Sequence, residues 1–176
     1  MSRKIFNYDD TSESKIIESL MDKGNLYENT ISACGCLFYK IVNNKLKLLL
    51  ISYSDPKWPK LDDFGGTVDK DDDTLIDAIV RETLEESNHK IKEGVLRKKL
   101  SGGKAFYNQQ SKYYVIAVEV DNDFYYDTSI FGDFEETDRI ERKLKWYEFS
   151  TNKEKLALRL LNNKKLMSFL SKLLIE

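Results

Sequence analysis

The sequence predicts an α/β (α+β) fold in which helices pack on a mixed β-sheet to form a sandwich. The chain has 176 residues, about the size of one domain, so we expect residues 1–176 to fold as a single unit. Apolar residues make up 41% of the chain, enough to build a core without disulfides or a structural metal. Patterns typical of strands and of helices alternate along the chain, and this order predicts a layered fold.

The first half of the chain predicts a leading helix and a β-hairpin. Residues 11–23 place apolar side chains at helical spacing before a glycine, so we expect an N-terminal helical extension over residues 1–28. Residues 30–42 and 46–53 are rich in β-forming side chains, and an Asn-Asn pair separates them. This pattern predicts two antiparallel strands joined by a tight turn.

The second half predicts a central helix, two more strands and a C-terminal helix. In residues 74–87 the apolar side chains fall within half of a helical wheel, so that half is expected to be buried. Residues 113–120 and 144–149 predict strands. Residues 153–174 predict a helix that is interrupted near Asn162-Asn163.

Scarce residue types limit the chemistry that the chain can perform. His89 is the only histidine, and Cys34 and Cys36 are the only cysteines, which excludes a zinc site with several His and Cys ligands within one chain. We expect the two cysteines to be reduced interior residues. Acid–base chemistry would therefore rest on carboxylates, and a metal held by them would be Mg²⁺ or Mn²⁺.

The net charge of −2 conceals an uneven distribution. Residues 61–89 hold ten acidic and two basic residues, a local charge of 2 − 10 = −8, and the remaining 26 basic and 20 acidic residues give 26 − 20 = +6. The total therefore does not exclude a ligand that carries phosphate groups. The acidic segment is the first indication of function.

Three glutamates of the central helix form the strongest candidate site. Glu82, Glu85 and Glu86 stand at i, i+3 and i+4, which places them on one flank of the helix. Like charges so arranged repel each other, and a divalent cation would convert this repulsion into binding. Gly65-Gly66 comes shortly before the helix, where a backbone without side chains can approach a ligand. A solvated helix face is the alternative for such a cluster in isolation.

The segment GGTVDKDDDTLIDAIVRETLEESNH resembles the Nudix box, in which a glycine, five residues, a glutamate and seven residues precede R-E-aliphatic-x-E-E-x-G-aliphatic. The run from Arg81 to Glu86 matches the R-E-x-x-E-E part. The departures are Asp73 for the early glutamate, one extra residue in the loop after Gly66, and Thr83, Asn88 and His89 at later positions.

The resemblance implies a Nudix-like α/β/α sandwich and a Mg²⁺- or Mn²⁺-dependent hydrolase of nucleoside diphosphates linked to another group. By resemblance, Glu82, Glu85, Glu86 and the Gly66 carbonyl would bind the metal, and one glutamate would accept a proton from water. Arg81 would orient a carboxylate of the motif. A further glutamate from a late loop often joins such sites, and Glu136 is the candidate that we carry forward, beside Glu135 and the less favoured Glu141.

Candidate substrate contacts are less well defined. Gly65 could bring its backbone close to a ligand, Trp58 and Phe64 could stack on a base or belong to the core, and Arg97 could contact phosphate. Arg139 and Arg142 are further candidates for a phosphate contact. The basic run between residues 90 and 104 could attract a polyphosphate or RNA, or simply form a solvated sheet edge.

The leading hypothesis is an enzyme that cleaves a diphosphate linkage in a nucleoside triphosphate, a dinucleoside polyphosphate or a similar nucleotide. The alternatives are a hydrolase of capped RNA and a Nudix-like module that binds a nucleotide or protein without cleaving it. A calcium-binding EF-hand loop starting at Asp69 fails because Thr74 and Val80 stand where Gly and Glu are required.

No apolar run approaches the ~20 residues that a membrane-spanning helix needs, and no hydrophobic signal segment begins the chain. We therefore expect a soluble, cytoplasmic protein without a membrane partner. Monomer and homodimer both stay open.

Overall fold

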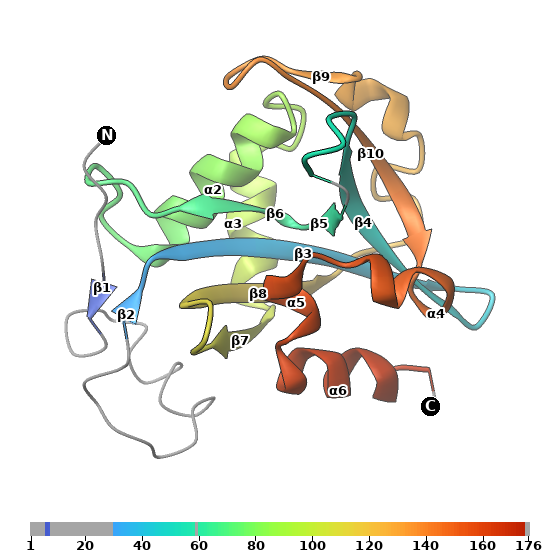
Figure 1. Ribbon diagram of the computed structural model, residues 1–176. Helices are drawn as coiled ribbons and strands as arrows, with labels where there is room; N and C mark the ends of the chain where they lie inside the picture. Colours follow the sequence, from blue (N-terminus) through green and yellow to red (C-terminus); the bar gives the residue numbers. More distant parts are fainter. Residues whose placement is uncertain (1–5, 8–29, 59, 175–176) are drawn as a thin grey trace.

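The computed structural model describes residues 6–7, 30–58 and 60–174 (Figure 1). The helix expected over residues 11–23 lies outside the described residues. A short pair of strands, β1 (Phe6–Asn7) and β2 (Thr30–Ile31), precedes the main sheet.

The predicted hairpin is confirmed. Strand β3 (Ala33–Val42) pairs antiparallel with β4 (Lys45–Tyr53), with Val42 opposite Lys45. Asn43 and Asn44 have φ values of 51° and 59°. Asparagine tolerates this left-handed conformation better than most residues, and a two-residue turn of this kind matches the twist of the flanking strands.

A mixed sheet forms the middle layer, as predicted. Among the described residues its path runs β7-β8-β3-β4-β10-β9, with β5 paired to β4 and β6 paired to β3. The β3–β8 pair is parallel and the other pairs are antiparallel. The remaining strands are β5 (Leu61–Asp62), β6 (Phe64–Thr67), β7 (Lys104–Asn108), β8 (Tyr113–Glu119), β9 (Phe134–Glu135) and β10 (Ile140–Glu148).

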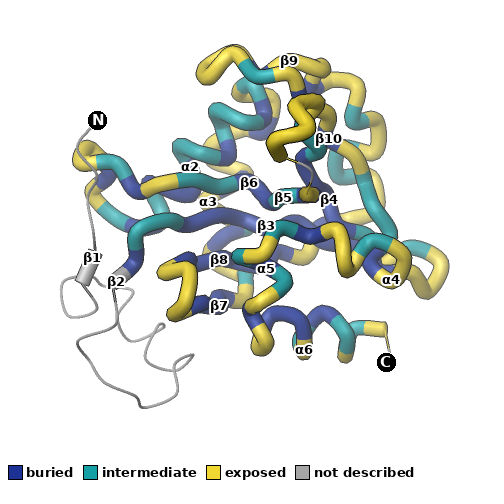
Figure 2. Tube along the Cα trace, in the orientation of Figure 1, coloured by how far each residue is buried: buried dark blue, intermediate teal, exposed yellow. Residues whose placement is uncertain are grey.

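Helices cover both faces of this sheet, which gives the expected α/β/α layering. Helices α2 (Leu75–Glu86) and α3 (Glu93–Ser101) lie on one face, and α5 (Leu158–Leu161) and α6 (Lys164–Lys172) lie on the other (Figure 1). Each face has its own apolar cluster. The central strands are buried between them, and exposed residues concentrate in the loops (Figure 2).

Helix α2 begins where its sequence provides a cap. The Thr74 side chain accepts a hydrogen bond from the Asp77 backbone N–H, and the Asp77 carboxylate accepts one from the Thr74 N–H, which is a capping box. Leu75, Ile79 and Val80 of the predicted stripe are buried. The helix is therefore fixed at one end by its cap and along one side by its core contacts.

The C-terminal region differs from the single interrupted helix that the sequence predicted. Residues 149–172 form α4 (Phe149–Asn152), the 3₁₀ helix η4 (Lys153–Lys155), α5 and α6. The predicted break is present, since Asn163 caps α6. The helix fails before α5 because the Ala157 N–H donates to the Leu61 carbonyl of β5 at 2.8 Å, so sheet pairing replaces helical bonding there.

Other elements were not predicted, among them the short strands β5, β6 and β9. The basic run from residue 90 to 104 contains α3 and leads into β7, and a second 3₁₀ helix, η3 (Thr128–Phe131), precedes β9. Leu96 and Leu100 bury one side of α3, while Lys98 is exposed and Lys99 is partly buried over the Phe124 ring. No helix in the described part of the chain combines the length and the apolar character needed to cross a membrane.

Candidate functional site

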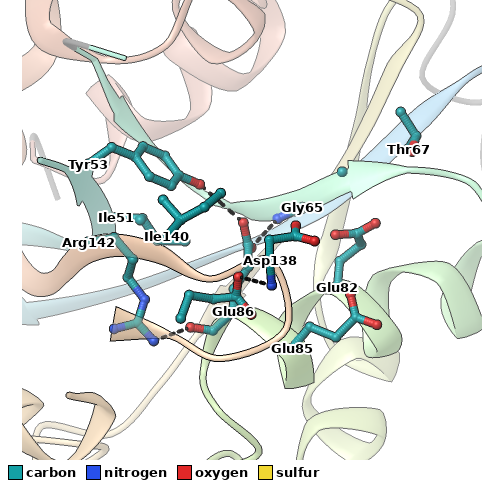
Figure 3. Close-up of a pocket in the computed structure, with 12 residues that line it drawn as sticks. Ile51, Tyr53, Gly65, Thr67, Glu82, Glu85, Glu86, Asp138, Ile140 and Arg142 are labelled. Atoms are coloured by element: carbon teal, nitrogen blue, oxygen red, sulfur yellow. Dashed lines mark hydrogen bonds between the residues drawn. The ribbon is translucent and has the colours of Figure 1, made fainter. Parts of the chain in front are cut away.

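A cavity of about 260 Å³ opens where α2, β6 and the start of β10 meet (Figure 3). Five carboxylates line it, three from α2, one from the end of β9 and one from the turn between β9 and β10. The lining residues are Ile51, Tyr53, Gly65, Gly66, Thr67, Glu82, Glu85, Glu86, Glu135, Asp138, Ile140 and Arg142. The structure thus brings the predicted glutamates and glycines together at one place.

Gly66 lies against Glu82 so closely that a side chain would not fit without a shift. A Cβ atom added to Gly66 would come within 2.5 Å of a Glu82 carboxylate oxygen. Ala78, one turn earlier on α2, is fully buried, so the helix and β6 can approach each other there. The glycine therefore forms a cradle for the carboxylate.

Glu86 turns away from the other two glutamates and toward the sheet. Its carboxylate accepts hydrogen bonds from the Gly65 N–H at 2.8 Å and from the Tyr53 hydroxyl at 3.3 Å (Figure 3). Burial raises the pKa of Glu86 well above its ordinary value, and Glu82 adds to this, while Arg159 opposes it. Glu86 thus has both a fixed position and an increased proton affinity.

Arg81 contacts the other two glutamates of α2, Glu82 and Glu85, and also the acidic loop that precedes the helix. Its guanidinium donates to the Glu82 carboxylate at 2.8 Å and lies 3.5 Å from Glu85. It also forms a two-bond contact with Asp72, at 3.0 and 2.9 Å, and donates to the Thr67 carbonyl. These contacts support the expectation that Arg81 orients a carboxylate.

Asp72 of the acidic loop before α2 takes part in positioning Arg81. It is 5% exposed and pairs with the arginine. This pairing raises the pKa of Arg81, with the Asp72 hydrogen bonds as the main cause. The loop residue therefore anchors the arginine that orients Glu82.

The two remaining glutamates of α2 lie in a crowded negative environment. Burial raises the pKa of both Glu82 and Glu85, Arg81 lowers it, and the Asp138 carboxylate raises it further. Glu85 is the more exposed of the two, with 28% of its side chain accessible against 14% for Glu82. Positive charge brought into this pocket would be stabilised.

The end of β9 and the turn that follows it supply Glu135 and Asp138 to the pocket, and not Glu136. The Glu135 carboxylate is 5% exposed and accepts hydrogen bonds from the backbone N–H groups of Thr137 and Asp138. Glu136 is exposed, and its backbone N–H donates to the Asn88 side chain. The tight turn around Glu135 directs its neighbour away from the cavity.

Asn88 joins the end of α2 to η3 and β9. It has φ 51°, consistent with the left-handed conformation expected where the motif has glycine. Its side-chain amide donates to the carbonyls of Phe131 and Phe134, at 2.9 and 2.8 Å. Asparagine therefore provides a tether that glycine could not, and nothing in the sequence pattern pointed to this role.

The predicted substrate contacts are only partly brought to the pocket. Gly65 lines it, but Phe64 is fully buried in the apolar cluster beneath α2 and packs edge-on against Phe38. Arg97 lies on α3, paired with Asp77 and Glu93. Trp58 is 54% exposed in the loop after β4 and does not line the cavity.

Tyr53 and Arg142 are pocket residues that the sequence did not place there. Arg142, considered as a phosphate contact, is instead fully buried and donates to the carbonyls of Glu86, Phe131 and Gly132 at 2.8, 3.2 and 2.6 Å. It therefore fixes the end of α2 against η3. Its pairing across the sheet with Tyr53 is a long-range contact with no local sequence signal.

The donor atoms suit Mg²⁺ or Mn²⁺, since they are carboxylate oxygens beside a glycine cradle. Within residues 30–58 and 60–174, no group of three or more His, Cys, Asp or Glu side chains is arranged so that it could hold a metal ion. Two of the glutamates are bound to different groups: Glu82 pairs with Arg81, and Glu86 accepts a hydrogen bond from the Gly65 N–H.

No protein-family model matches the sequence, and no curated protein matches it. Among solved structures, a C. elegans Ap4A hydrolase in a binary complex is 20% identical, with a TM-score of 0.42 over 81% of this chain and 93% of that one. NrtR from Shewanella oneidensis is 12% identical, with a TM-score of 0.48 over 80% and 63%.

A bifunctional NMN adenylyltransferase/ADP ribose pyrophosphatase from Francisella tularensis, complexed with AMP and a Mn ion, is 17% identical. Its TM-score is 0.47 over 92% of this chain and 47% of that one. All three scores are below 0.5, so these similarities are loose. The function has to be judged from the residues of the site.

Proposed function

We propose that the chain is a Mg²⁺- or Mn²⁺-dependent hydrolase that cleaves a diphosphate linkage in a nucleotide derivative, of the kind that the Nudix-like motif implies. The observation that supports this most directly is the cradle itself. One flank of α2 lies against Gly65-Gly66 in a single cavity, and this flank carries Glu82, Glu85 and Glu86. Arg81 is bound to Glu82.

In this proposal the three glutamates and the Gly66 carbonyl hold the cation. A bound Mg²⁺ or Mn²⁺ ion would supply positive charge that makes a water more acidic and offsets the charge of the diphosphate. Arg81 orients Glu82, while Gly65 and Tyr53 fix Glu86. Raised pKa values make these carboxylates better proton acceptors near neutral pH.

The size of the cavity indicates how a substrate would lie. About 260 Å³ is smaller than the ~300–1,000 Å³ of typical ligand pockets. The pocket would therefore take the diphosphate, and the nucleoside would extend beyond it. Trp58, exposed on the loop that follows Tyr53, is the aromatic residue that we propose to stack on the base.

The test is turnover by the purified protein with Mg²⁺ or Mn²⁺ on a substrate panel. The panel holds normal and oxidised nucleoside triphosphates, dinucleoside polyphosphates, nucleotide sugars and capped RNA. Glu85→Gln and Glu86→Gln are each expected to reduce kcat by about 100-fold or more, since each removes a charged ligand or base. Glu154→Gln, an exposed acid outside the cavity, serves as the control.

Absence of turnover on every substrate, or full turnover in both glutamine variants, would contradict the enzymatic assignment. A non-catalytic binding module would instead bind a nucleotide or a protein equally well in those variants. A capped-RNA hydrolase requires turnover of capped RNA and strong salt dependence. Reversing the charges of Lys98 and Lys99 would then reduce that turnover.

A further inference from the structure

A largely buried ion cluster, in which the side chains of Arg159 and Asp62 are each 22% exposed, lies on the face of the sheet opposite to α2. Arg159 of α5 donates to the carboxylates of Asp62 and Asp63, each at 2.9 Å, and its guanidinium lies 4.3 Å from the centre of the Tyr113 ring. The Tyr113 hydroxyl donates to Asp63 at 2.7 Å. Asp63 and Tyr113 are buried almost completely.

This cluster contacts the glycine strand of the pocket from behind. The Arg159 guanidinium also donates to the Gly65 carbonyl at 3.4 Å. A Cβ atom on Gly65 would come within 2.3 Å of the Tyr113 hydroxyl oxygen. On the other side, the Gly65 N–H donates to Glu86 and Gly66 lies against Glu82. Strand β6 is therefore held between Arg159 and Tyr113 on one face and two pocket glutamates on the other.

Fastening the C-terminal region does not require such a cluster. Leu156, Leu160 and Leu166 already bury this region in the apolar core of that face. Buried ion pairs add little stability compared with well-packed apolar residues, because desolvation offsets their attraction. The position of the cluster behind Gly65 needs another explanation.

We propose that Arg159 is a positioning residue for the carboxylate pocket, which fixes strand β6 so that Gly65 and Gly66 present Glu86 and Glu82 in a geometry that binds a divalent cation. This inference rests on the proposed function. It also adds a residue more than 70 positions from the motif glutamates to the machinery that prepares the site.

Mn²⁺ affinity distinguishes a positioning role of Arg159 from a simple charge effect, because the two predict opposite changes in affinity when the arginine is removed. Removing a positive charge near the pocket would by itself tighten cation binding. Loss of positioning weakens it, as changes to residues that orient metal ligands commonly do by about 10–100-fold. For Arg159→Met we therefore expect a Mn²⁺ dissociation constant about tenfold higher, measured on the full chain from the paramagnetic resonance signal of free Mn²⁺.

Arg159→Lys keeps the charge but loses the forked donor, so it gives an independent reading if the methionine variant does not fold. Positioning predicts an intermediate loss of Mn²⁺ affinity, and a charge effect predicts no change. Leu161→Ala is the matched control. It loosens the same short helix at an apolar contact and leaves all charges in place, so its Mn²⁺ affinity should equal that of the wild type.

Hydrogen exchange of the peptide 61–67 is the second measurement. It should be faster in both Arg159 variants than in Leu161→Ala, since the Gly65 carbonyl loses its contact with the arginine. Unchanged or tighter Mn²⁺ binding in the Arg159 variants would overturn the inference while the proposed function stands. If the wild type binds no Mn²⁺, the proposed function fails, and unchanged exchange of this peptide would then overturn the role of Arg159.

Discussion

Glu86 carries its negative charge into the most enclosed part of the carboxylate pocket. Its two hydrogen bonds, from Gly65 and Tyr53, do not compensate for lost hydration, because burial still raises its pKa well above the ordinary value. Below that raised pKa the folded state binds the proton more strongly than the unfolded chain does. Ionisation of Glu86 therefore reduces stability as the pH rises above about 4.5.

Replacing Glu86 with glutamine removes this titration. We expect the free energy of unfolding of Glu86→Gln, relative to the wild type, to be higher at pH 8 than at pH 5 in metal-free buffer. Urea unfolding at the two pH values measures it, with Glu154→Gln as an exposed control. A difference between the two proteins that does not vary with pH would contradict the assignment.

The adjacent glycines of β6 should respond differently to the same substitution. A Cβ atom on Gly65 would come within 2.4 Å of the Cys34 carbonyl, which is fixed in β3, whereas on Gly66 it would come against the mobile end of the Glu82 side chain. Gly65→Ala should cost about 1–3 kcal/mol of stability. Gly66→Ala should cost less but weaken Mn²⁺ binding, because Glu82 must move. Denaturant unfolding and Mn²⁺ titration of both variants separate the two effects.

At the scale of elements, α2 determines where the acidic side chains stand. Its capping box fixes the start, its apolar stripe fixes its rotation, and Asn88 ties its end to the segment before β9. Glu82, Glu85 and Glu86 share one flank because of their i, i+3, i+4 spacing, and the fixed start and rotation of the helix turn that flank toward β6. The cap is thus part of what aligns the site.

Loss of the cap should be measurable as stability. Thr74→Ala removes the oxygen that accepts the Asp77 N–H and should lower the free energy of unfolding by about 1 kcal/mol. Ser168→Ala, at an exposed position within α6, should cost nothing. An equal effect of the two substitutions on the free energy of unfolding in urea would show that the Thr74 hydrogen bond does not stabilise the fold.

At the scale of the whole molecule, the sheet separates the carboxylate pocket from the ion cluster around Arg159. The pocket on the α2 face is dominated by carboxylates, and Arg159 on the other face is a cation that lowers the pKa of Glu86. Repulsion among the pocket carboxylates persists in the metal-free protein. A divalent cation that binds only the folded chain would relieve it and stabilise the fold.

Thermal unfolding should therefore respond to Mn²⁺. At a free concentration 100 times the dissociation constant, binding contributes about 2.7 kcal/mol, which corresponds to an increase in Tm of about 5–10 °C for a chain of this size. Calorimetry with and without Mn²⁺ measures the shift, and the combined Glu82→Gln and Glu85→Gln variant should lose it. An equal shift in that variant would place the ion elsewhere.

The local sequence was sufficient to predict the elements that depend on interactions between neighbouring residues. The Asn43-Asn44 turn, the start and buried stripe of α2 and the break at Asn163 are confirmed, because turns, caps and helical periodicity depend on neighbouring residues. The motif likewise brought Glu82, Glu85 and Glu86 to one flank. Their metal-binding role stays a prediction.

Tertiary structure alone decided which distant residues complete the site. Glu135 and Asp138 line the cavity and Glu136 does not, Arg142 holds backbone, Phe64 is buried, and Arg159 lies behind Gly65. These placements depend on how β10 and α5 pack on β4 and β6, between segments about 50 to 100 residues apart. No local periodicity encodes such contacts, because their energy arises only when the strands and helices have come together.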